Sequence, residues 1–370
     1  MKNKQVNSEI YHDKKLLDTL TLMTINDECD LLINFATFYR DPNISLTMLP
    51  YYALFCVEAG KRFEEIGIPL EQIDNGPFNI NVTRARLKLF NDRIGKVIKL
   101  IDTIHNDQDQ LYKNKYKSIL RKKFNLYANM GITFYKNKIM ANTYYIISLM
   151  DKKDGHYVDV SGPEVFEFAK GLGQTIDNIF NISIQMKRNA PDIRRKDITV
   201  LYKDININRC KVFSIEGKDC RALSVLLLNV LGNINFTNYL VEDIIGNNTW
   251  KLRIQYISMY YAREMMLRVA EKTEDIIISK RIEEGINSLY PIFDSKFRNC
   301  LMHYSFAENG QKLIEEKYFD IETPLYGLVE SCFDGKSYKE LSNEIKGNLF
   351  KMESTLNSML LIDSSKLKKF

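Results

Sequence analysis

The scarcity of residues that interrupt helices is the feature that most constrains the fold of this chain. Its 370 residues include only 8 prolines and 17 glycines, and these residues are the main breakers of regular structure. Over long stretches, such as residues 13–40, apolar side chains recur every three or four positions, the spacing of a helix with one buried face. Apolar residues make up 45% of the chain and charged residues 27%, as in globular proteins. We therefore predict a mainly α-helical globular protein.

The helical spacing places the expected helices in two groups. Thr83 is the expected N-cap of the helix over 82–107, and Gly232-Asn233 marks a possible break in the stretch over 219–245. The first group is expected at 13–40, 48–66, 82–107, 114–151 and 163–188, and the second at 219–245, 249–272, 274–290, 294–306, 325–334 and 337–362.

A change of character separates the two groups. Residues 189–192 are a cluster of breakers, residues 194–196 are all cationic, and two short β-branched or aromatic segments follow at 198–202 and 211–215. We predict that these two segments form a small β-hairpin. A chain of this length usually holds two domains. The predicted organisation is an N-terminal helical domain of unknown role at 1–190, a linker or hairpin at 191–217, and a second helical domain at 218–370.

Nothing near the N-terminus predicts export or membrane insertion. The first 20 residues contain no uninterrupted apolar run and no small-residue cleavage site. The most apolar run, 222–231, is far shorter than the roughly 20 residues that span a membrane. The six cysteines are scattered and form no Cys-x-x-Cys pair, which favours reduced thiols. We expect a cytoplasmic protein with no membrane partner.

The side chains available for chemistry are few. Lysine and arginine exceed aspartate and glutamate by 52 − 47 = 5, so any affinity for nucleic acid must come from local patches. The four histidines show no metal-ligand spacing, and no phosphate-binding or nucleophile motif occurs. We therefore expect no metal and no cofactor. His12, His105 and His156 are interpreted as surface or structural histidines.

The fourth histidine lies in a different context, Phe-Arg-Asn-Cys-Leu-Met-His-Tyr over 297–304. Asn299 and His303 are four apart and face the same side of the predicted helix. Arg298 lies in the first turn, where the helix N-terminus adds positive potential. A cation for phosphate oxygens, a titratable imidazole and an orienting amide are the groups that metal-free RNA cleavage needs.

This segment resembles the motif of the HEPN superfamily, an Arg followed by a polar residue, three to five further residues and a His. Arg298-Asn299-x-x-x-His303 matches the ribonuclease form. The likeness covers about residues 218–365 and implies a helical bundle of four to five helices with the motif at the start of its third main helix. It does not cover the N-terminal half. The structural alternative is a buried or capping histidine on an amphipathic helix.

The resemblance also implies roles for these residues. Arg298 would bind the scissile phosphate, His303 would act as general acid and base, and Asn299 would orient the imidazole or the phosphate. The products would be a 2′,3′-cyclic phosphate and a 5′-hydroxyl, formed without metal. Some members add a carboxylate from another helix, for which Glu264 and Glu283 are the candidates in this sequence.

The resemblance further implies the biological setting. HEPN nucleases usually form homodimers in which two motifs line one cleft. Members with an intact motif serve as toxins or as abortive-infection effectors against phage, so an antitoxin or a phage-derived trigger is an expected partner. Other members have lost catalysis and act as binding or scaffold modules. RNA is the expected substrate of the first kind.

A second basic segment supports RNA binding. Residues 111–127 carry six cations and no acid, interleaved with aromatic side chains, a combination that suits single-stranded RNA. The alternative is an amphipathic helix with an aromatic core face and solvated lysines. The residues assigned to RNA binding are Lys117, Arg121, Lys122 and Lys123, together with Tyr304 beside the motif.

Two functions from different classes therefore stay open. The first is a metal-independent endoribonuclease that acts as a toxin or antiphage effector, with an N-terminal domain that senses, inhibits or guides. The second is a non-catalytic helical scaffold that binds nucleic acid or protein. The size of the chain favours an effector with built-in regulation over a minimal toxin.

Overall fold

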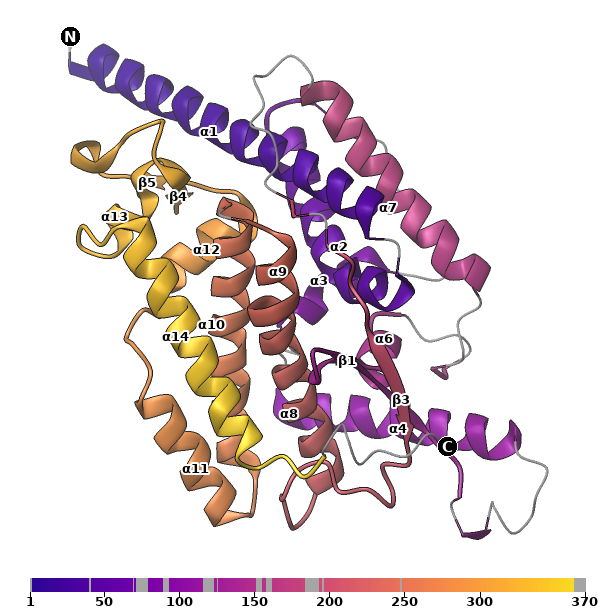
Figure 1. Cartoon of the computed structure of the whole chain (residues 1–370). Helices are drawn as coiled ribbons and strands as arrows, with labels where there is room; N and C mark the ends of the chain where they lie inside the picture. Colours follow the sequence, from indigo (N-terminus) through magenta and orange to yellow (C-terminus); the bar gives the residue numbers. More distant parts are fainter. Residues whose placement is uncertain are drawn as a thin grey trace.

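The mainly α-helical fold is confirmed by a computed structural model, shown in Figure 1. The structure describes residues 2–39, 41–68, 70, 79–88, 93–115, 123–124, 126–150, 155–157, 162–183, 193–194, 196–246 and 248–362. Long helices form two groups with a small sheet between them.

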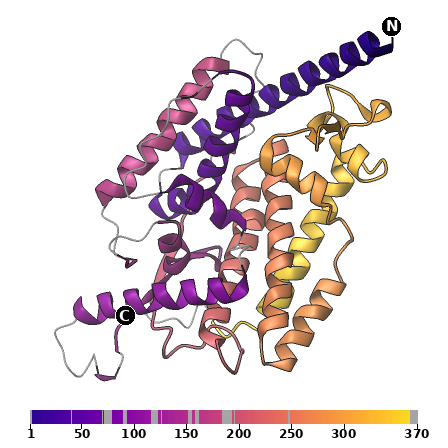
Figure 2. The ribbon, with the colours of Figure 1, turned by 180° about the vertical axis from the view of Figure 1, so that it is seen from behind.

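The N-terminal group consists of three long helices and the short elements that follow them. Helix α1 (Lys2–Phe38), helix α2 (Pro42–Glu65) and helix α7 (Gly162–Ser183) pack against one another, as Figures 1 and 2 both show. The N-terminal part of α1 lies over the second group, where Asp13 and Lys312 form an ion pair of 3.3 Å. The N-terminal helices therefore contact the second group directly.

The helix expected over 82–107 is divided in the structure. It consists of α3 (Ile80–Ala85), the 3₁₀ helix η1 (Arg86–Lys88) and α4 (Ile94–Lys115). Asn79, not Thr83, caps α3, because its side-chain oxygen accepts the N–H groups of Asn81 and Val82, the second and third residues of the helix. The buried Thr83 hydroxyl instead donates to the carbonyl of Leu149 at 2.9 Å.

The helix expected over 114–151 is wrong for its second part. Residues 130–142 form a hairpin of β1 (Met130–Tyr135) and β2 (Lys138–Asn142), and α6 (Thr143–Ser148) follows. Lys136 and Asn137 form the turn with φ of 49° and 62°, the left-handed geometry of tight hairpin turns. The β-branched and aromatic side chains of β1 are all buried, so a strand buries both faces where a helix would bury one.

The hairpin predicted from 198–202 and 211–215 is also wrong in its pairing. Strand β3 (Leu201–Ile205) pairs antiparallel with β1, which gives the sheet order β2-β1-β3. Residue Phe213 instead bridges to Leu360 near the end of the chain. The edge of β1 that does not face β2 offers a full row of backbone groups to β3. The segment over 211–215 is too far along the chain from 198–202 to pair with it through a tight turn.

The C-terminal group is built around one central helix. Helix α10 (Thr249–Lys272) packs against α8 (Cys220–Asn235), α11 (Ile276–Asn287), α12 (Ser295–His303) and α14 (Tyr338–Asn357), as Figure 2 shows from behind. The smaller elements are η2 (Phe236–Val241), α9 (Glu242–Ile244), β4 (Ala307–Glu308), β5 (Gln311–Lys312), η3 (Glu316–Tyr318), η4 (Pro324–Gly327) and α13 (Leu328–Cys332).

Helix α8 connects the bundle to the sheet. It has no break at Gly232, and it continues through the π-helix η2 into α9. A Cβ atom at Gly232 would lie 2.7 Å from the carbonyl oxygen of Met140 on β2, so glycine permits this close approach. Cys220–Ile244 is long and apolar enough to cross a membrane, but 83% of its apolar window is buried inside the protein. The fold itself covers this apolar surface.

The apolar core is continuous between the two groups. Buried side chains of α1 and α2 belong to the same cluster as those of the sheet, α8 and α10. Strand β3 lies within the predicted linker 191–217 and pairs with a strand from the first half of the chain. The division into domains at 1–190 and 218–370 stays a prediction.

Candidate functional site

Helix α12 carries the predicted motif and has well-defined ends. The side chain of Asp294 accepts the N–H of Phe297 at 2.6 Å, which caps the first turn. The Phe297 ring is buried between the rings of Tyr256 and Phe333, with centroids 4.8 and 5.0 Å away. Tyr304 ends the helix in the left-handed conformation, with φ of 48°. This packing fixes the direction in which the motif residues leave the helix.

The first two motif residues are held by neighbours within the C-terminal group. The guanidinium of half-buried Arg298 donates to the hydroxyl of Tyr261 at 2.8 Å and lies 4.8 Å from the ring centre of Tyr260. Asn299 donates to Glu308 at 3.2 Å. Asn299 is therefore positioned by β4, and among the described residues no hydrogen bond joins it to the imidazole.

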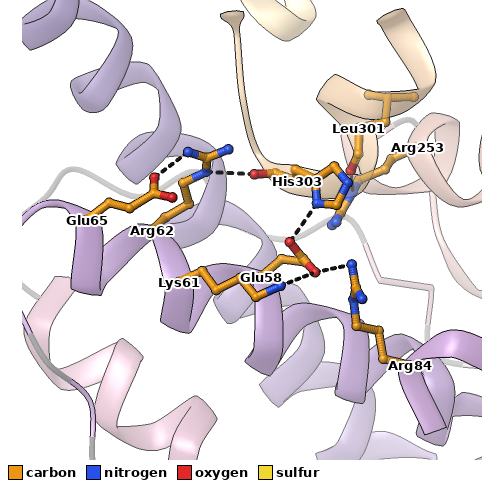
Figure 3. Close-up of polar contacts among 8 residues, drawn as sticks. All are labelled: Glu58, Lys61, Arg62, Glu65, Arg84, Arg253, Leu301 and His303. Carbon is orange, nitrogen blue, oxygen red and sulfur yellow. Dashed lines mark hydrogen bonds and ion pairs between the residues drawn. The ribbon is translucent and has the colours of Figure 1, made fainter. Parts of the chain in front are cut away.

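His303 is held by a carboxylate from the other half of the chain (Figure 3). Its Nδ1 lies 2.8 Å from Oε2 of Glu58, on α2. Burial alone would raise the pKa of Glu58, but the hydrogen bond from His303 and the nearby cations outweigh it, so the pKa lies below its usual range. An ionised carboxylate accepts only, so Nδ1 carries the proton and Nε2 is left as acceptor or second donor.

Glu58 connects the imidazole to two cations. Its other oxygen pairs with the guanidinium of Arg84 on α3 and lies 3.5 Å from the Lys61 ammonium. The Glu58 side chain is only 2% exposed, whereas that of His303 is 39% exposed. The carboxylate is thus enclosed, while the imidazole reaches solvent.

The backbone of the motif helix is also tied to α2. Arg62 donates from Nε to the carbonyl oxygen of His303 at 2.8 Å, and its other end pairs with Glu65. This bond satisfies a carbonyl at the end of α12 that has no partner within the helix. One turn of α2 therefore fixes both the backbone and the side chain of His303.

A further cation lies on η1. Burial lowers the pKa of the half-buried Lys88, and the positive charges of Arg84 and Arg298 lower it further. The influence of Glu58 on Lys88 opposes these effects, and that of Lys61 adds to them. Helix η1 packs against α2 and α3, and α12 packs against α2, so the cations on these elements lie near one another. They define a set that we call the basic cluster: Lys61, Arg84, Lys88 and Arg298.

The adjacent residue, Tyr304, faces a separate site. It is 3% exposed, and its hydroxyl lies between the carboxylate of Glu28 and the guanidinium of Arg253. Burial raises the pKa of Glu28, although the charge of Arg253 opposes this. The ring of Tyr304 is in the core, so it has no face open for stacking on an RNA base.

The basic segment over 111–127 is only partly described. Lys117, Arg121 and Lys122 lie outside the described residues, and Lys123 is exposed at the surface. Tyr127 is buried, and its hydroxyl donates to Asp109 at 3.0 Å. The assignment of Lys117, Arg121, Lys122 and Lys123 to RNA binding stays a prediction.

The other candidate carboxylates and histidines are engaged elsewhere. Glu264 pairs with the neighbouring Arg263, and Glu283 accepts from Ser279. His105 is buried beside Tyr144, and burial lowers its pKa to about 4. The exposed His156 pairs with Asp107 at 3.0 Å. The side chain of His12 is not among those that the structure describes.

The sequence interpretation therefore missed the N-terminal side of the site. The available signal was Glu58, an acid inside the otherwise apolar stretch 53–59. A buried charge on an apolar helix face requires a partner. The partner itself was not readable, because His303 lies 245 positions further along the chain.

Comparisons with known proteins provide no relative. No family model, no curated protein and no solved structure matches the chain. Within the described residues, no group of three or more His, Cys, Asp or Glu side chains is arranged to hold a metal ion. Any function must therefore be argued from the geometry around His303 and from the resemblance of its motif.

Proposed function

We propose that the protein is a metal-independent endoribonuclease that cleaves RNA by attack of the ribose 2′-hydroxyl. The observation that carries the proposal is the pairing of a solvent-reaching imidazole, His303, with the enclosed carboxylate of Glu58 beside a group of cations. A carboxylate that fixes the tautomer of an imidazole is a recurring arrangement for acid–base catalysis.

The proposed chemistry uses His303 as the group that moves protons. With Nδ1–H donated to Glu58, Nε2 takes the proton of the 2′-hydroxyl. The 2′ oxygen forms a bond to phosphorus, the bond from phosphorus to the 5′ oxygen breaks, and the imidazolium returns its proton to that oxygen. The products are a 2′,3′-cyclic phosphate and a 5′-hydroxyl. Glu58 is a positioning residue here, since it touches the imidazole and not the RNA.

Arg298 supplies positive charge that its present partners do not cancel. Burial raises the pKa of Tyr261, although the charge of Arg298 opposes this, so the hydroxyl that receives its hydrogen bond is neutral. A guanidinium bonded to a neutral hydroxyl keeps its full charge for a phosphate oxygen. Stabilising the charge that builds on the phosphate is the role we assign to it.

The biological role that we propose follows the resemblance. The enzyme would act as a toxin or abortive-infection effector, controlled by an antitoxin or a phage-derived trigger. Induced expression of the wild type should then slow growth and degrade cellular RNA, and the Arg298→Ala variant should do neither. Equal growth of the two cultures would contradict this part of the proposal.

The nuclease proposal is tested with purified full-length protein and end-labelled single-stranded RNA in EDTA. We expect products ending in 2′,3′-cyclic phosphate. His303→Ala should lower the rate by roughly 10²–10⁴-fold, the usual contribution of a general acid or base. Arg298→Ala should lower it by about 10²–10³-fold, as loss of one charge-stabilising donor does.

A matched control separates chemistry from folding. His156→Ala removes an exposed histidine from a loop, and it should cleave RNA as the wild type does. All variants should be folded at the assay temperature by circular dichroism, although His303→Ala loses its hydrogen bond to the enclosed Glu58 and should melt at a lower temperature. Wild-type protein that binds RNA but leaves it intact in EDTA would contradict the nuclease and favour the non-catalytic scaffold.

A further inference from the structure

We propose that Arg84 and Lys88 bind backbone phosphates of single-stranded RNA beside the phosphate held by Arg298. The N-terminal half, which the motif resemblance does not cover, would then supply part of the RNA-binding site. This inference rests on the proposed function, because it names how that site holds its substrate. It adds residues from α3 and η1 to a site otherwise built on α12.

The first support is the imbalance of charge. The basic cluster holds four cations, and among the described residues its ion pairs are all made with one carboxylate, Glu58. Glu58 pairs with Arg84 and lies near Lys61, and no ion pair is found for Lys88 or Arg298 among the described residues. In this part of the structure, Lys88 and Arg298 are half-buried cations without a counter-charge among the described residues. Glu58 is shared by Arg84, Lys61 and the imidazole, so the cluster as a whole favours binding of an anion.

The second support is a shortage of hydrogen-bond acceptors. The Nε atoms of Arg84 and Arg298 are both buried, and neither has a partner among the described residues. Buried N–H groups of arginine are normally satisfied. Their neighbourhood therefore offers more donors than acceptors, which is the composition of a phosphate-binding site.

The third support is the position of these cations relative to His303. Arg84 pairs with the same carboxylate that holds the imidazole, and the helix η1, which carries Lys88, packs against both α2 and α3. A strand whose scissile phosphate lies at Arg298 and His303 would carry further phosphates on each side. Regularly spaced phosphates match cations contributed by several elements better than an acidic peptide does, so we commit to RNA.

The experiment measures binding of a single-stranded 2′-O-methyl RNA, which lacks the attacking hydroxyl and cannot be cleaved. Binding to full-length protein is followed by fluorescence anisotropy at several salt concentrations. Each phosphate contact to a single strand contributes about 0.7 to the slope of log K against log salt. Lys88→Gln should therefore lower this slope by about 0.7 and weaken binding about fivefold at 0.1 M salt.

Matched variants separate charge from structure. Lys88→Arg keeps the charge and should bind as the wild type does. Arg84→Lys should keep the salt slope, whereas Arg84→Ala should lower it as Lys88→Gln does. Arg281 lies on α11, toward the other end of the bundle from α12 in both views, so Arg281→Ala should leave binding unchanged.

The outcomes distinguish this inference from the nuclease proposal. Wild-type slope and affinity in Lys88→Gln and Arg84→Ala would overturn the inference and leave the nuclease standing. Loss of slope in both variants, with no cleavage by the wild type, would support the RNA site and overturn the nuclease. No salt-dependent binding by the wild type would overturn the inference whatever the cleavage assay gives.

Discussion

Two enclosed carboxylates from neighbouring N-terminal helices reach adjacent residues of the same C-terminal helix, yet their surroundings differ. Glu28 on α1 and Glu58 on α2 are each 2% exposed. Glu28 meets Arg253 and Tyr304, which are themselves 4% and 3% exposed. Glu58 meets His303, which is 39% exposed. The first cluster is sealed in the core, and the second opens to solvent.

The pKa values of the two carboxylates move in opposite directions for this reason. At Glu28 burial outweighs the charge of Arg253 and raises the pKa. At Glu58 burial is outweighed by the hydrogen bond from His303 and by nearby cations, and the pKa falls. A sealed cluster of this kind serves the structure, whereas an open one with excess cations has the properties expected of a binding site.

The largest expected effect on stability is at the sealed cluster. Arg253→Met keeps most of the side-chain volume but leaves Glu28 buried without its cation. Breaking a buried ion pair from one side costs about 3–5 kcal/mol. Denaturant unfolding should show this loss, and the double variant with Glu28→Gln should recover part of it. A loss below about 1 kcal/mol would mean that the two clusters do not differ as described.

A smaller effect is expected at the open cluster. Glu58→Gln should lower the free energy of unfolding by about 1.5–3 kcal/mol at neutral pH, the range for hydrogen bonds to charged groups. If Glu58 positions His303, kcat should fall roughly tenfold or more, a part of what acid–base catalysis contributes, while KM for RNA changes little. A fall in stability with unchanged kcat would leave Glu58 a structural residue only.

The same variant tests the direction of the pKa shift. Because the pKa of Glu58 is lower in the folded state, the unfolded state binds more protons in the acid range. The stability that ionised Glu58 contributes to the folded state is therefore present above about pH 4.5 and is lost as the pH falls through its folded pKa. The stability difference between wild type and Glu58→Gln should shrink below pH 4.5, whereas Glu28, with its raised pKa, contributes a slope of opposite sign.

The smallest effect is expected at the rim of the open cluster. Lys61 is 53% exposed and lies 3.5 Å from Glu58. Exposed pairs of this kind contribute about 0–1 kcal/mol. Lys61→Ala should therefore change the free energy of unfolding by no more than about 1 kcal/mol. A loss as large as that of Arg253→Met would show that the open cluster is a structural ion pair as well.

Much of the helical layout could be read from the sequence, but particular elements could not. Helices α1, α2 and α10 could be predicted because their apolar residues recur every three or four positions, which is the spacing of a buried helix face. A short apolar run is compatible with a buried strand as well as with a buried helix, so the pattern over 130–142 does not distinguish the hairpin from a helix. Its turn at Lys136 and Asn137 lacks glycine, so the usual signal of a tight hairpin was absent.

The sequence by itself determined the mainly helical class and the local order of Arg298, Asn299 and His303, since helix spacing and capping act over a few residues. Only the tertiary structure decided which groups meet them. Tyr304 adopts a left-handed conformation at the end of α12, and His303 and Tyr304 reach different carboxylates. Those carboxylates lie more than 200 positions away in the chain. Such contacts follow from the packing of the whole core, which no local pattern encodes.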